Sequence, residues 1–171
     1  MAEILELTKS IDASNLEAWL IVRTDPAKSL AMAEKCLTEA QEIAYQKGIA
    51  WSYGNIGAAH TWLGNYEKAL EFSFKAVELL QETGELKQEV QILYNLSIVF
   101  HFLGDSDKQL HYAFESLHLA RKIGDRSGEA NGLNGVGTVH YYIGKNEEAI
   151  EYLTEGSMAK MKRPLNTSQR V

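Results

Sequence analysis

The chain has few residues that break helices or crosslink a fold. Its 171 residues include only two prolines, Pro26 and Pro164, both near an end, and a single cysteine, Cys36. A proline-free interior favours helices, because proline removes a backbone donor and clashes with the preceding turn. One thiol cannot form an internal disulfide or, alone, a zinc site, so we expect a reducing, cytoplasmic setting.

The sequence also lacks the features of proteins that bind nucleic acid or membranes. The formal net charge of −6 disfavours polyanionic partners. The first residues carry acids where a secretory signal would carry lysines, and no apolar run approaches the length that crosses a bilayer. We therefore expect a soluble protein that binds neither nucleic acid nor membranes, with enough hydrophobic residues, 45%, for a sizeable core.

What the chain does have is a repeat of 40 residues. Gly64, Gly104 and Gly144 each end an apolar segment at this spacing, and Asn15 recurs as Asn55 and Asn95. A second register holds the small residues Cys36, Ala76, Ser116 and Gly156, and a third holds Leu30, Leu70, Leu110 and Ile150. A fixed period with many matched positions predicts stacked repeats. We place them at about 9–48, 49–88, 89–128 and 129–163 in one domain, 1–163, followed by a polar tail, 164–171.

Within each repeat the pattern predicts two antiparallel helices. In the second repeat, residues 49–63 carry no charge and end at Gly64-Asn65, and residues 66–82 form an amphipathic stripe. In the first repeat, Asp25 as N-cap and Pro26 at the first helical position replace the glycine turn. We expect helices at 7–22, 27–47, 49–63, 66–82, 89–103, 106–123, 129–143 and 146–161.

The repeat resembles a tetratricopeptide repeat, whose pattern is a large residue, a Leu-Gly pair and an aromatic, then two small residues on the second helix. The second repeat matches with Tyr53, Ile56-Gly57, His60, Ala69 and Ala76. The 40-residue period exceeds the family's usual 34 and is similar to the long-helix variety of bacterial signalling proteins and cell-polarity scaffolds. HEAT and armadillo repeats share the period, but are not expected to place glycine at the turn between the helices. The resemblance implies an all-α fold, a right-handed α-solenoid of about four helix-turn-helix repeats.

For function, the resemblance implies a non-enzymatic protein- or peptide-binding module without a cofactor, in which the first helix of each repeat lines a concave face. By alignment this face carries aromatic and amide side chains and no charged residue, so capture of a C-terminal carboxylate is disfavoured. We expect the ligand to be an apolar or amphipathic protein segment. The expected binding residues are Asn15, Trp51, Asn55, Trp62, Tyr94, Asn95, Ile98, His101, Phe102, Asn134, Thr138, Tyr141 and Tyr142.

The asparagines among these residues allow two interpretations. An amide donates and accepts at once, and peptide-binding members of the family use asparagine at the register of Asn15, Asn55 and Asn95. The alternative is that these three side chains only bond between adjacent helices.

No nucleophile and base can be paired in the sequence, so we predict no catalytic residues. His111, Glu115 and His118 share one helix face, but this is more typical of a solvated face, and we predict no metal.

The last helix carries apolar residues with no following helix to cover them, including Leu153, Met158 and Met161. Either the chain is the N-terminal sensory or regulatory domain of a larger signalling enzyme, such as a nucleotide cyclase or histidine kinase, or a second copy covers the open end. The second case predicts a homodimer or a self-assembling scaffold.

Overall fold

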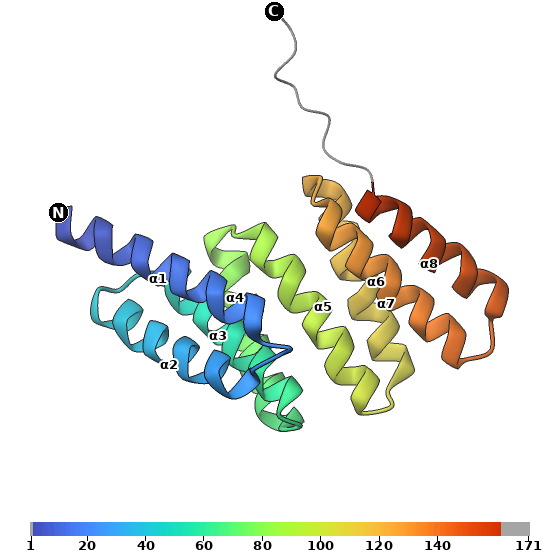
Figure 1. Cartoon of the computed structure of the whole chain (residues 1–171), viewed down its shortest axis with the longest axis horizontal. Helices are drawn as coiled ribbons and strands as arrows, with labels where there is room; N and C mark the ends of the chain where they lie inside the picture. Colours follow the sequence, from blue (N-terminus) through green and yellow to red (C-terminus); the bar gives the residue numbers. More distant parts are fainter. Residues whose placement is uncertain (1, 162–171) are drawn as a thin grey trace, which may run out of the picture.

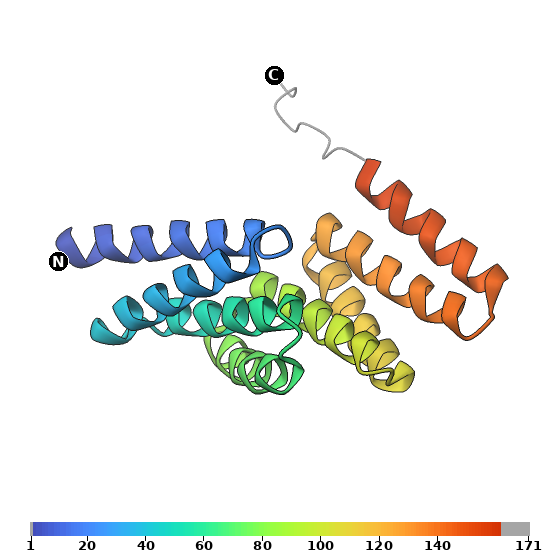
Figure 2. The ribbon, with the colours of Figure 1, turned by 60° about the horizontal axis from the view of Figure 1, so that its bottom comes forward.

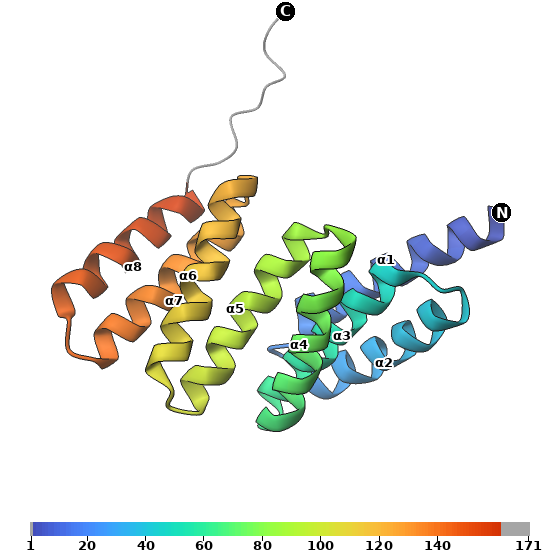
Figure 3. The ribbon, with the colours of Figure 1, turned by 180° about the vertical axis from the view of Figure 1, so that it is seen from behind.

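The computed structural model describes residues 2–161, which form eight α-helices and no strand (Figure 1). The helices are α1 (Ala2–Ile21), α2 (Pro26–Glu42), α3 (Gln46–Trp62), α4 (Tyr66–Thr83), α5 (Leu86–Phe102), α6 (Ser106–Ile123), α7 (Arg126–Tyr142) and α8 (Asn146–Met161). Each consecutive pair forms an antiparallel hairpin, and the hairpins stack side by side (Figures 1 and 3). The direction of the helices changes progressively from one end to the other (Figure 2). The predicted α-solenoid is confirmed, while the predicted tail at 164–171 lies outside the described residues.

At the sharp reversals between helices, one residue adopts a left-handed backbone conformation with positive φ. Gly84 and Gly124 end α4 and α6 with φ of 73° and 71°, and Gly64, Gly104 and Gly144 take φ of 77°, 73° and 79° in the turns inside the hairpins. Only glycine enters this region without steric cost. In the first repeat the position equivalent to Gly84 is Ala44, which takes φ of 53°. This reversal corrects the predicted helix at 27–47, because α2 ends at Glu42 and α3 begins at Gln46.

Small residues allow close approach of helices both within a hairpin and between neighbouring hairpins. A Cβ atom on Gly57 would lie 2.5 Å from Ser73 Oγ and 3.0 Å from the Ser73 backbone nitrogen. A Cβ on Gly132 would lie 2.9 Å from Leu117 Cα. These distances are shorter than real Cβ contacts, so the packing of α3 on α4 and of α6 on α7 requires glycine.

Aromatic pairs fill the contact between the two helices of a repeat. His60 stacks on Phe72 with ring centroids 6.0 Å apart, Phe100 on Tyr112 at 5.4 Å and His140 on Tyr152 at 5.3 Å. The pairs recur at the 40-residue period. Burial lowers the pKa of the His60 imidazole, whose ring is 7% exposed.

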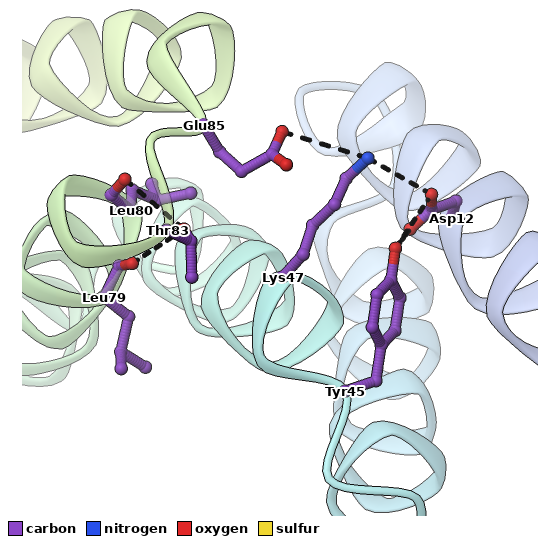
Figure 4. Close-up of polar contacts among 7 residues, drawn as sticks. All are labelled: Asp12, Tyr45, Lys47, Leu79, Leu80, Thr83 and Glu85. Carbon is purple, nitrogen blue, oxygen red and sulfur yellow. Dashed lines mark hydrogen bonds and ion pairs between the residues drawn. The ribbon is translucent and has the colours of Figure 1, made fainter.

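A polar cluster joins three repeats at the side where each hairpin connects to the next (Figure 4). The Tyr45 hydroxyl donates to Asp12 Oδ1 at 2.9 Å, and Lys47 Nζ lies 3.4 Å from Asp12 Oδ2 and 3.8 Å from Glu85 Oε2. Burial and the Asp12 carboxylate raise the pKa of Tyr45, so its hydroxyl remains a donor at neutral pH. The cluster fixes α1 relative to the starts of α3 and α5.

Candidate peptide-binding groove

Three adjoining hollows follow α5 from its beginning to its end, and we call them together the groove. The first lies among Leu16, Leu20, Lys87, Gln91 and Asn131, the central one among Trp19, Arg23, Ala58, Trp62 and Asn95, and the last among Ile98, His101, Phe102, Gln109 and Thr138. Tyr94 lines all three. The stretch from Lys87 to Phe102 corresponds to about 22 Å at 1.5 Å per helical residue, which is enough for several side chains of a bound segment.

The groove is built from the first helix of every repeat. The second half of α1 forms one wall, the last turns of α3 form the floor, and α5 and α7 form the other wall. The hollows have volumes of about 230, 120 and 220 Å³ along α5. A cavity of roughly 150 Å³ accommodates a benzene-sized group, so each hollow matches about one large side chain.

Trp62 lies at the centre of the aromatic surface of the groove. Its ring meets Phe102 edge-on with centroids 6.0 Å apart, and the Arg23 guanidinium carbon lies 4.8 Å from the Trp62 ring centroid. Beyond Phe102, His101 contacts Tyr142 with centroids 5.1 Å apart. The aromatic surface therefore continues past the last hollow onto the end of α7.

Tyr94 combines an apolar ring with a polar end in the middle of the groove. Burial raises the pKa of its hydroxyl, while the positive charge of Arg23 lowers it, and the net direction is upward. The hydroxyl is therefore neutral at physiological pH and can both donate and accept a hydrogen bond.

The structure corrects the expectation for four of the predicted binding residues. Asn15 and Asn55 are fully buried and Trp51 is 8% exposed, while Asn95 borders the central hollow but is only 2% exposed, so these four side chains offer little or no surface to a ligand. Asn55 and Trp51 are buried because α3 packs against α1, α2, α4 and α5, and Asn15 and Asn95 lie on the helices that pack against it.

The buried asparagines instead bond between adjacent helices, which was the alternative interpretation. Asn55 Nδ2 donates to the Asn15 carbonyl oxygen at 2.8 Å and to Asn15 Oδ1 at 3.0 Å. Asn95 Nδ2 donates to Thr61 Oγ1 at 3.2 Å and to Ser73 Oγ at 3.3 Å. These bonds satisfy the amide donors of Asn55 and Asn95, whereas among the described residues Asn15 Nδ2 and Asn55 Oδ1 are buried without a hydrogen-bond partner.

The other predicted residues divide into two groups. The side chains of Trp62, Tyr94, Ile98, His101, Phe102 and Thr138 line the groove. Outside it, Asn134 directs its Oδ1 toward Gly156 on α8, because a Cβ on Gly156 would lie 2.8 Å from that oxygen. Tyr141 and Tyr142 are exposed at the end of α7 and lie next to the last hollow rather than in it.

Charged residues do line the groove, which contradicts the expected uncharged face. Arg23 lines the central and last hollows, and Lys87 and Asp125 line the first. Trp19 and Arg23 were missed because α1 was aligned on the register of buried asparagines. Comparison of equivalent positions in the four repeats could have found both residues, because the first repeat differs from the others there. Trp19 replaces the small or branched residues Ala59, Val99 and Val139, and Arg23 replaces the apolar residues Leu63, Leu103 and Ile143.

Across residues 2–161, no three His, Cys, Asp or Glu side chains are grouped so that they could hold a metal ion. None of the helices in the same range combines the length and the apolar character that a membrane span requires.

Comparison with known proteins identifies the repeat. Residues 48–112 match the sequence model of the tetratricopeptide repeat family. Among solved structures, the chain is similar to the crystal structure of BtubC (BKLC) from P. vanneervenii, with a TM-score of 0.70 and 15% identity over 94% of this chain and 69% of that one. At this identity the likeness shows a shared fold. No curated protein matches the chain in sequence. Residues 48–112 are therefore similar to tetratricopeptide repeats, and the hairpin matched there recurs on both sides at the same 40-residue period.

Proposed function

We propose that this chain is a non-enzymatic binding module whose groove holds an apolar or amphipathic segment of another protein. Tetratricopeptide repeats generally act as protein-interaction modules. The observation that carries the finer proposal is the row of three hollows along α5, with Trp19, Trp62 and Tyr94 at its centre. Each hollow matches one large side chain, so a segment with apolar residues on one face fits it.

The chemistry of the walls supports an amphipathic rather than a wholly apolar ligand. Leu16, Leu20 and Phe102 leave exposed apolar surface at both ends of the groove. Between them, Gln91 and Asn131 offer amide groups in the first hollow. Such amides can pair with the backbone of a bound segment, while the apolar surfaces accept its side chains.

The test is selection of binding peptides from a random dodecapeptide display library, followed by fluorescence anisotropy with the selected peptides. Aromatic anchors in the centre of an interface typically dominate its affinity. We expect Trp62→Ala and Tyr94→Ala each to weaken binding by about 1–3 kcal/mol, or roughly 5- to 150-fold. Both side chains are only partly buried, so the variants should fold.

Phe114→Ala provides the matched control. Phe114 is an exposed aromatic on α6, outside the groove, and its ring contacts Tyr152 at 6.3 Å. Its removal should leave affinity unchanged. Equal losses in Phe114→Ala and Trp62→Ala, or a library without binders, would refute the proposed site.

A second proposal concerns the exposed face of α8 and involves self-association. Ile150, Leu153, Met158 and Met161 are all exposed on this helix. A second copy could cover them by pairing α8 with α8. Light scattering over a dilution series should then show a concentration-dependent dimer, which Ile150→Lys should abolish. A monomer at all concentrations contradicts this proposal and leaves the groove unaffected.

A further inference from the structure

Arg23 is an exposed cation that borders the groove, and none of the acidic side chains in the described part of the chain pairs with it. It follows α1 and lines the central and last hollows, with its guanidinium carbon 4.8 Å from the Trp62 ring centroid. In the range 2–161, no carboxylate lies within ion-pair distance of it. Arg121, by contrast, pairs with both Glu129 and Glu155. A guanidinium that lies over an aromatic face keeps its N–H donors available to a ligand.

We propose that Arg23 binds the side-chain carboxylate of an acidic residue inside the segment that occupies the groove. This inference rests on the proposed function and names the chemistry of its ligand. The planar guanidinium offers parallel N–H donors that match the two oxygens of a carboxylate. A segment that fills the adjoining hollows would cover the exposed Arg23 side chain and exclude water from such a pair, which strengthens it relative to one on an open surface.

The remaining charges of the groove agree with an acidic ligand. Lys87 lines the first hollow and, within the described residues, forms no ion pair. The acid in that hollow, Asp125, is engaged as an N-cap, because its Oδ1 accepts from the Ser127 backbone nitrogen at 3.1 Å. The groove is therefore net positive in a chain whose formal charge is −6. It should attract acidic segments and repel basic ones.

The position of Arg23 favours an internal acidic residue over a C-terminal carboxylate. Arg23 lies at the boundary between the central and last hollows, and the groove continues on both sides of it. A segment that ended at Arg23 would leave hollows on one side empty. A segment that runs along α5 fills apolar sites before and after its acidic residue.

The experiment uses the same dodecapeptide library, selected separately against the wild-type chain and Arg23→Met. Methionine retains an apolar stem to cover Trp62 but removes the charge. Peptides selected by the wild type should contain Asp or Glu flanked by apolar residues, and those selected by Arg23→Met should lose the acid. In a selected peptide, Glu→Gln should weaken binding to the wild type about tenfold, the usual effect of a charge-assisted hydrogen bond. The same change should have little effect on binding to Arg23→Met.

Lys68→Met is the matched control, since Lys68 is an exposed cation on α4 that lines none of the three hollows. It should respond to the Glu→Gln peptide as the wild type does. If wild-type peptides carry no acid, or if Glu→Gln has the same effect on the wild type and on Arg23→Met, the inference is wrong while the groove remains. If amidation of the peptide's C-terminus abolishes binding, the chain end is the ligand and the internal carboxylate is refuted. A library without binders refutes both the inference and the proposed function.

Discussion

Replacing Gly132 by alanine should destabilise the array more than the same replacement at Gly135, one turn later on α7. A Cβ on Gly132 would lie 2.8 Å from Leu117 Cβ, 2.9 Å from Leu117 Cα and 3.0 Å from the Leu117 backbone nitrogen. The backbone of α6 cannot move alone, so α6 and α7 would have to separate. A Cβ on Gly135 would meet three side-chain atoms, Ala113 Cβ at 3.2 Å, Tyr94 Cε2 at 3.5 Å and Ser97 Oγ at 3.8 Å, which small shifts can accommodate.

The comparison isolates the packing cost. Both glycines lie inside α7, so each substitution gains about 1 kcal/mol of helix propensity, and this gain cancels in the difference. Overpacking of a close contact costs about 1–3 kcal/mol. The free energy of unfolding of Gly132→Ala should therefore fall below that of Gly135→Ala by about 1–3 kcal/mol, or several degrees in Tm for a chain of this size. Urea and thermal unfolding followed by circular dichroism measure both, and equal stabilities would refute the proposed close approach of α6 and α7.

Three further substitutions test other contacts. Ala44→Gly should stabilise the chain by about 1 kcal/mol in urea unfolding, because Ala44 takes φ of 53° where Gly84 stands in the next repeat. Asn55→Ala should lower the free energy of unfolding by about 1–3 kcal/mol, because it removes the hydrogen bonds to Asn15, and it should leave peptide affinity unchanged. A loss of peptide affinity would instead show that Asn55 belongs to the binding site. Burial lowers the pKa of His60 in the folded chain, so as the pH falls this imidazole is protonated in the unfolded chain before it is protonated in the folded chain. The free energy of unfolding should therefore decrease as the pH drops below about 6.5. In His60→Phe the decrease in Tm between pH 7.5 and 5.5 should be smaller, and an identical decrease would exclude His60 as its source.

The repeat, the helix pairs and the turns could be predicted from the sequence because each depends on local and periodic signals. Gly64, Gly104 and Gly144 mark reversals that need a left-handed residue, and the prediction of helices between them is confirmed. The small residues at Gly57 and Gly156 predicted close helix contacts, and a Cβ at either would clash with a neighbouring helix. The boundary at Ala44 was missed because alanine carries no signal for a left-handed turn.

The composition of the groove was decided by the tertiary structure, because the packing of one repeat on the next determines which face of each first helix remains open. Asn15 and Asn55 share one position of the 40-residue repeat, at which the family resemblance predicted binding residues, but in this chain α1 and α3 pack together and bury them. Arg23 lies in a turn, where the sequence indicates only a solvated cation, and the curvature of the array places it against Trp62. Period and local conformation are properties of neighbouring residues. The exposure of a side chain and the charge of a groove depend on residues that only the stacking of the hairpins brings together.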